Sequence, residues 1–461
     1  MSDINRRDFI KLGLAGSAGL VAGQQIIHPT QVYAGGIEGL EKTKLKFGFI
    51  PLTDCAPLVI AEKKGFFKKY GLEVDVLKEA SWANIRDKVA IGALDGGHML
   101  AGMPIAASLG VGAIKKPTIT AFSMDLNGNA ITVSNALYER MVEADPAAMN
   151  ERPLTARALK KVIDADKAAG KPPMTFAMVF PVSTHNYELR YWMASAGINP
   201  DQDVRLIVIP PPQMVANLRA NNIAGYCVGE PWNERAVKMG IGRTLITNYE
   251  IWNNNPEKVF GVNQEWADKH PNTHKAVLMA LLEASKWMDK PENRLEVAKI
   301  ISKRSYVNAP LDVVKMSMTG TFLYSKNEDP RPLADFNVFH RYAATFPWLS
   351  HGEWFITQMI RWGQIDKALD IKKTIAEVYR PDIYRDAAKA LGMDYPTIDF
   401  KTEGTHAEPW VLSEATAPIA MGRDIFFDGK TYDPNKLVDY IRGFDIHNIK
   451  VSLDELEKLN G

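Results

Sequence analysis

The sequence has only two cysteines, Cys55 and Cys227, in 461 residues. One pair in a chain of this length cannot form the dense disulfide framework of small secreted domains. Both cysteines lie in apolar runs, so we expect two buried free thiols. Neither lies near the N-terminus, which leaves no cysteine there for lipid attachment.

Net charge is also nearly absent, because 55 Lys and Arg residues stand against 54 Asp and Glu residues, for a formal charge of +1. Residues 1–34 carry one more positive than negative charge, and without them the chain is formally neutral. No global field can therefore steer nucleic acid or an anion to this protein. Any preference for an anion must come from a local cation.

Enzyme signatures are missing as well. The sequence contains no P-loop, no GxSxG and no HExxH motif. His270 and His274 are four positions apart, but Pro271 lies between them and no cysteine or acidic partner is near, which argues against a metal site. We expect no catalytic residues, no cofactor and no metal. The chain after residue 34 also lacks an apolar run long enough to cross a bilayer.

The first 34 residues have the features of an export signal. Arg6 and Arg7 are adjacent, Phe9 follows, and a mildly apolar Gly/Ala-rich segment runs from Leu12 to Gly23. Val32 and Ala34 then supply small or compact residues at the −3 and −1 positions of a processing site. The paired arginines resemble a twin-arginine signal, which an export receptor reads. We expect cleavage near Ala34 and a soluble periplasmic protein.

From Lys44 onward, predicted strands and helices alternate. Strands at 44–51, 72–79 and 118–126 are separated by helical patterns, and a second set of units begins at residue 174. Between the first two strands, Pro57 opens a predicted helix that Gly71 closes. This rhythm predicts an α/β fold with mostly parallel sheets in two units. Residues 136–172 are charged and Ala-rich and predict a helical insertion, and the chain from about 265 to the end is mainly helical.

Several corners between a predicted strand and the following helix carry polar side chains. In open parallel sheets, ligands bind at these corners, where helix N-termini also favour anions. Taken singly, each residue has a plainer interpretation: a core tryptophan, a structural histidine, a surface lysine in the turn "NNNPEK". Together they form a set of hydrogen-bond donors with one ammonium group. The set comprises Trp82, Asn129, Ser183, Thr184, His185, Lys258 and, as weaker candidates, Gly229 and Glu230.

Long blocks of the sequence resemble one family. "GFIPLTDCAPLVIAEKKGFFKKYGLEVDVLKEASWANIRDKV", "NGNAITVSN", "STHNYELRYWMASAGINP", "IPPPQMVANLRANNIAGYCVGEPW", "NPEKVFGV" and "HGEWFITQMIRWG" are similar to the nitrate/nitrite/bicarbonate substrate-binding proteins of ABC importers. The resemblance implies a type II periplasmic-binding-protein fold, with two α/β lobes that close on a ligand. It places residues 44–126 and 231–461 in lobe I with a helical C-terminal extension, and residues 127–230 in lobe II.

The resemblance also implies roles for individual residues. The family pocket uses a tryptophan matched by Trp82, an amide where this chain has Asn129 in place of the usual glutamine, a histidine matched by His185 with main-chain contacts just before it, and a lysine matched by Lys258. Bicarbonate-type relatives carry an acidic residue at the lysine position, together with calcium. Lys258 therefore favours nitrate or nitrite, without a metal. The implied partners are an ABC permease and its ATPase subunit, and we expect a monomer.

Other functions stay open at this point. The anion could be bicarbonate, cyanate or a small sulfonate. A cytoplasmic nitrate sensor would share the pocket but lack an export signal. A thiamine-pyrimidine synthase relative would use a cysteine-rich motif, which two isolated cysteines do not supply.

Overall fold

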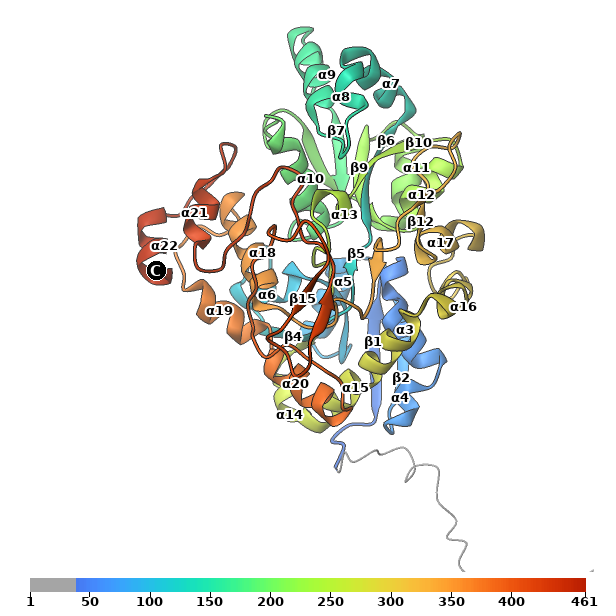
Figure 1. The fold of residues 1–461 in the computed structure, drawn as a ribbon, viewed down its shortest axis with the longest axis vertical. Coiled ribbons are helices and arrows are strands. Elements are labelled where there is room, and N and C mark those ends of the chain that lie inside the picture. Colours follow the sequence, from blue (N-terminus) through green and yellow to red (C-terminus); the bar gives the residue numbers. More distant parts are fainter. Residues whose placement is uncertain (1–38) are drawn as a thin grey trace, which may run out of the picture.

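The computed structural model describes residues 39–461, which form two α/β lobes and a C-terminal extension (Figure 1). The expected export signal at residues 1–34 lies outside the described part. None of the helices within residues 39–461 is both long and apolar enough to cross a membrane.

Lobe I is built on a five-stranded sheet in the order β2-β1-β3-β11-β4. β1 pairs in parallel with β2 and β3, whereas β11 runs antiparallel to both β3 and β4. The sheet is therefore mixed rather than purely parallel. Its strands are β1 (Lys44–Phe49), β2 (Glu73–Lys78), β3 (Gly96–Leu100), β4 (Thr118–Ser123) and β11 (Lys258–Asn263).

The helices of lobe I follow these strands. A short 3-10 turn, η1 (Thr53–Cys55), leads from β1 into the first helices. We expected a single helix from Pro57 to Gly71, but Gly65 adopts a left-handed conformation (φ 78°) and divides it into two. The helices are α3 (Ala56–Lys63), α4 (Phe66–Lys69), α5 (Trp82–Ala90) and α6 (Gly102–Leu109).

Lobe II is built on a second five-stranded sheet in the order β10-β6-β9-β7-β8. β7 pairs in parallel with β8 and β9, and β6 lies antiparallel between β9 and β10. Because β10 belongs to this sheet, the chain returns to lobe I after Thr247 and not at residue 231 as expected. The strands are β6 (Asn129–Ser134), β7 (Thr175–Met178), β8 (Arg205–Val208), β9 (Gly225–Gly229) and β10 (Gly242–Thr247).

The helices of lobe II include the expected insertion, which is confirmed as helical. It consists of α7 (Asn135–Ala144), α8 (Pro146–Met149) and α9 (Arg157–Ala168). The remaining helices are α10 (Thr184–Ser195), α11 (Met214–Arg219), α12 (Trp232–Lys238) and α13 (Asn248–Ile251), with a 3-10 turn η2 (Pro211–Gln213).

The chain crosses between the lobes twice, at residues 124–128 and 248–257, and asparagines join the two crossings. Asn255 is fully buried and its Nδ2 donates to Asn127 Oδ1 at 3.0 Å. Asn127 and Asn254 have φ angles of 63° and 58°, in the left-handed region that asparagine tolerates better than most residues. The turn predicted for "NNNP" is confirmed, and its asparagines tie together the hinge between the lobes.

The C-terminal extension (yellow to red in Figure 1) lies along both sides of the two lobes. α15 packs on α3 and α20, and α18 packs on α6, α19 and α21. Its helices are α14 (Gln264–Lys269), α15 (Pro271–Met288), α16 (Pro291–Ile301), α17 (Leu311–Met318), α18 (Leu349–Arg361), α19 (Ile371–Val378), α20 (Pro381–Ala390), α21 (Leu437–Arg442) and α22 (Leu453–Asn460). Short strand pairs are β5 (Leu126–Asn127) with β14 (Asn337–Val338), β12 (Thr321–Phe322) with β13 (Arg331–Pro332), and β15 (Trp410–Leu412) with β16 (Ile419–Met421).

Candidate functional site

Lys258 is buried between the two lobes rather than exposed in a turn. It is the first residue of β11, and its side chain is 0% exposed. Its Nζ lies 2.6 Å from Asp54 Oδ2 and also contacts the carboxylate of Glu257. The expected cation is therefore present, but two carboxylates already neutralise it.

Lobe I supplies three further groups around this lysine. Asp54 lies in η1, and its Oδ1 is 2.9 Å from Nε2 of His98 on β3. The other ring nitrogen of His98 accepts from the main-chain N–H of Ile50 at 3.4 Å, so Nε2 carries the proton and donates to Asp54. The ring centroid of Trp82 lies 5.7 Å from Lys258 Nζ.

Ser81 explains why Trp82 lies where it does. Its hydroxyl caps α5 by accepting a hydrogen bond from the N–H of Asn84 at 3.2 Å. The cap fixes the first turn of the helix, and Trp82 is the first residue of that turn. The indole is consequently held with its ring edge against His98, at a centroid separation of 5.0 Å.

Lobe II contributes from the opposite side. Asn129 on β6 donates from Nδ2 to Glu257 Oε1 at 2.7 Å, and His185 on α10 places Nδ1 3.1 Å from the same oxygen. Gly229 on β9 borders this group, because a Cβ built there would lie 3.2 Å from Asn129 Oδ1 and 3.5 Å from Asp54 Oδ2. Trp82, Asn129, His185 and Lys258 thus come together with Gly229. We call Asp54, His98, His185, Glu257 and Lys258 the central cluster.

The hydroxyls of Ser183 and Thr184 already have protein partners. Ser183 Oγ donates to the carbonyl of Phe180 at 2.7 Å and accepts from the N–H of Asn186 at 3.0 Å, which makes it the N-cap of α10. Thr184 Oγ1 donates to the carbonyl of Pro256 across the lobes at 3.2 Å. Thr184 can still offer its main-chain N–H, which lies in the first turn of α10 and has no intrahelical acceptor.

Glu230 likewise already has hydrogen-bond partners within the protein. Its Oε2 accepts from the N–H of Glu234 at 3.1 Å, at the start of α12. Its main-chain carbonyl accepts from the N–H of Thr53 at 2.8 Å, which joins the lobes. Burial raises the pKa of the Glu230 carboxyl to about 8.

Three members of the central cluster were not among the predicted site residues: Asp54, His98 and Glu257. Asp54 stands in the quoted block "PLTDCAP" directly before a helix start, and Glu257 is the neighbour of Lys258. An acidic residue before a helix is usually a cap, so its type alone gave no sign of this site. The adjacency of Glu257 to Lys258 was the one local signal available.

Burial dominates the protonation of the cluster. It works against the charge on Lys258, yet Asp54, Glu257 and nearby Asp125 raise the lysine pKa, so the ammonium is retained. Burial also works against ionisation of Asp54, but Lys258 and His98 outweigh it and the Asp54 pKa is lowered. These two residues therefore form a stable ion pair at neutral pH.

For the other ionisable groups in and around the cluster, burial favours the uncharged form. Burial raises the pKa of Glu257 to about 7 in spite of Lys258. Burial lowers the pKa of His185 well below its usual value, and Lys258 lowers it further. Burial also raises the pKa of Asp125 and Glu188 well above the usual range. Glu257 is thus the group in this cluster whose charge changes near neutral pH.

Several buried polar atoms around the cluster lack a hydrogen-bond partner within residues 39–461, and three of them are Trp82 Nε1, His185 Nε2 and Asn129 Oδ1. All three belong to side chains that are at most 1% exposed. Buried polar atoms without partners are rare in native proteins, and each needs an explanation. An indole N–H, an imidazole nitrogen and an amide are suited to hold a small polar ligand.

Comparisons with known proteins find one group of related proteins. The model of the NMT1-like family matches residues 38–302. The nitrate/nitrite binding protein NrtA of Nostoc sp. is 37% identical over 424 residues, which are 91% of this chain and 89% of that protein. The bicarbonate-binding protein CmpA of Synechococcus elongatus is 33% identical, with 90% of each chain covered.

A longer relative and a solved structure extend this result. The nitrate import ATP-binding protein NrtC of Synechocystis sp. is 40% identical over 93% of this chain, but the chain spans only 59% of that protein's length. The crystal structure of the periplasmic nitrate-binding protein NrtA from Synechocystis superposes with a TM-score of 0.77 at 33% identity, covering 89% of this chain and 100% of that one.

Proposed function

The chain belongs to the NMT1-like family, and on that premise we propose that it is a solute-binding protein that captures nitrate or nitrite for an ABC importer. The observation that carries the proposal is the pair of unpartnered nitrogens, Trp82 Nε1 and His185 Nε2, beside the buried lysine. A small planar oxyanion can accept from the indole and imidazole N–H groups. Hydrogen bonds to a charged group contribute about 1.5–3 kcal/mol each.

The charge of the cluster sets a condition on binding. Lys258 and Asp54 balance each other, so an ionised Glu257 would leave a net negative site facing an anion. We propose that the anion binds the form in which Glu257 is protonated. The protein then takes up a proton with the anion when Glu257 starts ionised.

The proton on Glu257 also determines the role of His185. A neutral imidazole has one N–H and one acceptor nitrogen. When Glu257 is ionised, the hydrogen of His185 stays on Nδ1, which lies 3.1 Å from Glu257 Oε1, and Nε2 is left as an acceptor. When Glu257 is protonated, its O–H donates to Nδ1, and Nε2 carries the hydrogen. His185 Nε2 thereby becomes a donor to the anion.

Bicarbonate is the second candidate ligand. Unlike nitrate, it carries an O–H, and the carboxylates of Asp54 and Glu257 beside Lys258 are acceptors for such a group. A CmpA-type relative is also similar over most of the chain. The finer proposals are that the protein is exported through a twin-arginine signal at residues 1–34, acts without catalysis as a periplasmic monomer, and delivers its anion to a permease with its ATPase subunit.

The test is titration calorimetry of the protein with nitrate, nitrite, bicarbonate and cyanate. We expect nitrate or nitrite to bind and bicarbonate to bind at least about tenfold more weakly. Tight binding of bicarbonate with no binding of nitrate would overturn the assignment. Lys258→Glu should abolish nitrate binding, but it also removes the cation from two buried carboxylates and can prevent folding.

Trp82→Phe is the sharper variant, because the indole N–H has no acceptor within residues 39–461. We expect nitrate affinity to fall about tenfold or more, with the unfolding temperature little changed. Trp192→Phe is the matched control: its indole donates to the carbonyl of Leu154 at 2.8 Å, inside lobe II, so it should lower stability and leave nitrate affinity intact. Unchanged affinity in Trp82→Phe would place the anion elsewhere.

A further inference from the structure

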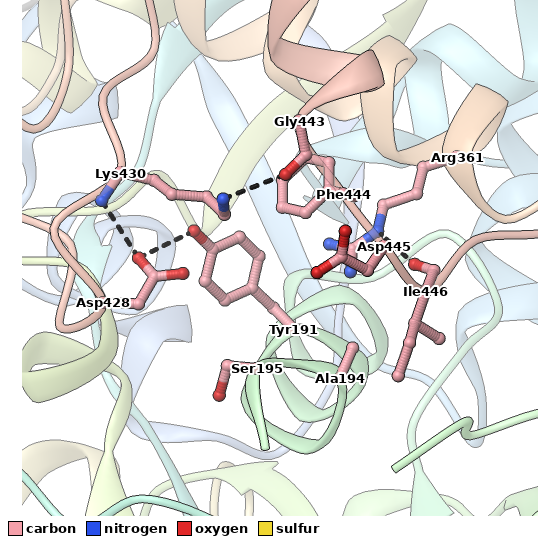
Figure 2. Close-up of a pocket in the computed structure, with 10 residues that line it drawn as sticks. All are labelled: Tyr191, Ala194, Ser195, Arg361, Asp428, Lys430, Gly443, Phe444, Asp445 and Ile446. Carbon is pink, nitrogen blue, oxygen red and sulfur yellow. Dashed lines mark hydrogen bonds between the residues drawn. The ribbon is translucent and has the colours of Figure 1, made fainter. Parts of the chain in front are cut away.

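A cavity away from the central cluster lies between α10 of lobe II and the C-terminal extension (Figure 2). Its volume is about 250 Å³. Drug-sized ligands occupy pockets of about 300–1,000 Å³, so this cavity fits a smaller metabolite. Its polar and aromatic walls are formed by Tyr191 of α10, Arg361 of α18, and Asp428, Lys430, Phe444 and Asp445 of the extension.

Arg361 is the residue that calls for a ligand. It is 2% exposed, and its Nε donates to the carbonyl of Ile446 at 3.1 Å. Its Nη1 has no hydrogen-bond partner within residues 39–461. Burial lowers the pKa of Arg361 to about 10, so the side chain is still a cation at neutral pH. A buried guanidinium with an unused donor is costly unless an acceptor from a ligand meets it.

The aromatic ring of Phe444 holds this guanidinium in place. Arg361 Cζ lies 3.6 Å from the ring centroid of Phe444 and 5.6 Å from that of Tyr191. These contacts fix the direction of the arginine, and its Nη1 stays buried without a partner. A planar carboxylate is the group that a fixed guanidinium binds best.

The cavity also has a fixed carboxylate. Asp428 Oδ1 accepts from the hydroxyl of Tyr191 at 3.0 Å and from the main-chain N–H of Lys430 at 3.2 Å (Figure 2). Lys430 Nζ donates to the carbonyl of Gly443 at 3.0 Å. These bonds hold the side chain of Asp428 at the cavity wall, where it can attract a positive group.

The charges of the lining are balanced. Arg361 and Lys430 are positive, and Asp428 and Asp445 are negative. A simple anion would therefore leave the two negative residues without a partner, and a simple cation would leave the two positive residues without one. We propose that this cavity binds an α-amino acid, with its carboxylate on Arg361 and its ammonium group on the side of Asp428 and Asp445.

This site is separate from the central cluster, although the same helix reaches both. His185 lies in the first turn of α10, whereas Tyr191 and Ser195 line the cavity further along. Tyr191 and Ser195 follow His185 by six and ten residues, which correspond to about 9 Å and about 15 Å along an α-helix. The amino acid and the anion therefore bind together without competition.

The test is a thermal-shift and calorimetric screen of the protein with the common L-amino acids, each with and without saturating nitrate. We expect at least one of them to bind and to stabilise the protein in both conditions. The matching carboxylic acid without the amine, and the matching amine without the carboxylate, should each bind at least about tenfold more weakly. Equal binding of either analogue, or displacement by nitrate, would overturn the proposal.

Variants locate the site. Arg361→Gln and Asp428→Asn should each weaken the amino acid about tenfold or more. Asp428 is exposed, so its variant keeps the test valid even if Arg361→Gln fails to fold. Arg190→Gln is the matched control: Arg190 lies on α10, 4.9 Å from the ring of Trp362, and does not line the cavity. No binding by any amino acid, or full affinity in Asp428→Asn, would refute the site.

Discussion

We expect Glu257 to make anion binding dependent on pH. Burial raises the pKa of the Glu257 carboxyl to about 7, although the charge of Lys258 lowers it. The carboxyl also faces Asp54 and His185, and Glu188 and Asp125 lie nearby. If the anion binds the protonated form, affinity is fully present below this pKa and is lost as the pH rises through it. The loss should approach about tenfold per pH unit above about pH 7. Calorimetric titration with nitrate across this range measures it.

Glu257→Gln provides the control for this dependence. A glutamine can accept a hydrogen bond from Lys258 through its oxygen. Asn129 Oδ1 has no partner within the described residues, and rotation of the Asn129 amide brings it to the NH₂ of the glutamine, which can then donate to it. The variant should therefore fold and bind nitrate with nearly the same affinity across the pH range. Retention of the wild-type slope in Glu257→Gln, or a flat profile in the unmodified protein, would contradict the mechanism.

At the residue scale, the sequence predicted positions better than charge states. The corner pattern and the family resemblance together selected Trp82, Asn129, His185 and Lys258, which the structure brings together. They gave no indication that Asp54, 204 positions away from Lys258, pairs with it. Such a pairing depends on how two distant corners meet, and neither periodicity nor helix-start chemistry contains that information.

At the scale of single elements, the start of α10 is the point of greatest interest. Ser183 caps this helix with both of its hydrogen bonds, so its hydroxyl is occupied. Ser183→Ala should therefore cost about 1–2 kcal/mol of stability, and nitrate affinity should change less than about threefold, a factor worth under about 1 kcal/mol. Thermal unfolding and calorimetry on the same sample measure the two effects.

Ser195→Ala is the control on the same helix. Ser195 is exposed, and its hydroxyl donates only to the carbonyl of Trp192 at 2.8 Å, one turn earlier. Its loss should stay within about 0.5 kcal/mol. A large drop of nitrate affinity in Ser183→Ala without a loss of stability would show that this hydroxyl contacts the anion after all.

Elements were predictable where one residue decides the local structure. Ser81 starts α5, and Asn254 makes the predicted turn before Lys258. The helix predicted from Pro57 to Gly71 was wrong in its continuity, because the glycine at position 65 takes a left-handed conformation that packing selects and that sequence only permits.

At the scale of the whole molecule, the lobes are held together by hydrogen bonds that cross between them. The N–H of Thr53 donates to the carbonyl of Glu230 at 2.8 Å, and the indole of Trp232 donates to the carbonyl of Pro51 at 3.0 Å. Two lobes could be predicted from the repeated α/β rhythm. The return crossing after Thr247 could not, because β10 pairs at the sheet edge with β6, a long-range contact that leaves no local pattern.

Gly102 tests whether anion capture needs the lobes to meet. A Cβ at this first residue of α6 would lie 2.3 Å from the main-chain oxygen of Val182, in the loop before α10 of the other lobe. Because that neighbour is backbone, Gly102→Ala should hold the lobes apart. Each lobe should still fold, since alanine suits a helix better than glycine.

We expect Gly102→Ala to weaken nitrate binding about tenfold or more, because the imidazole N–H of His185 can no longer reach an anion held beside Lys258 and Trp82. Small-angle X-ray scattering should show that nitrate compacts the unmodified protein and leaves the variant unchanged. Gly352→Ala is the matched control, since its methyl group would meet the Ile375 side chain within the extension. That variant should lower the unfolding temperature and keep its nitrate affinity. Full affinity in Gly102→Ala would mean that the anion binds one lobe alone, and the central cluster would then not be its site.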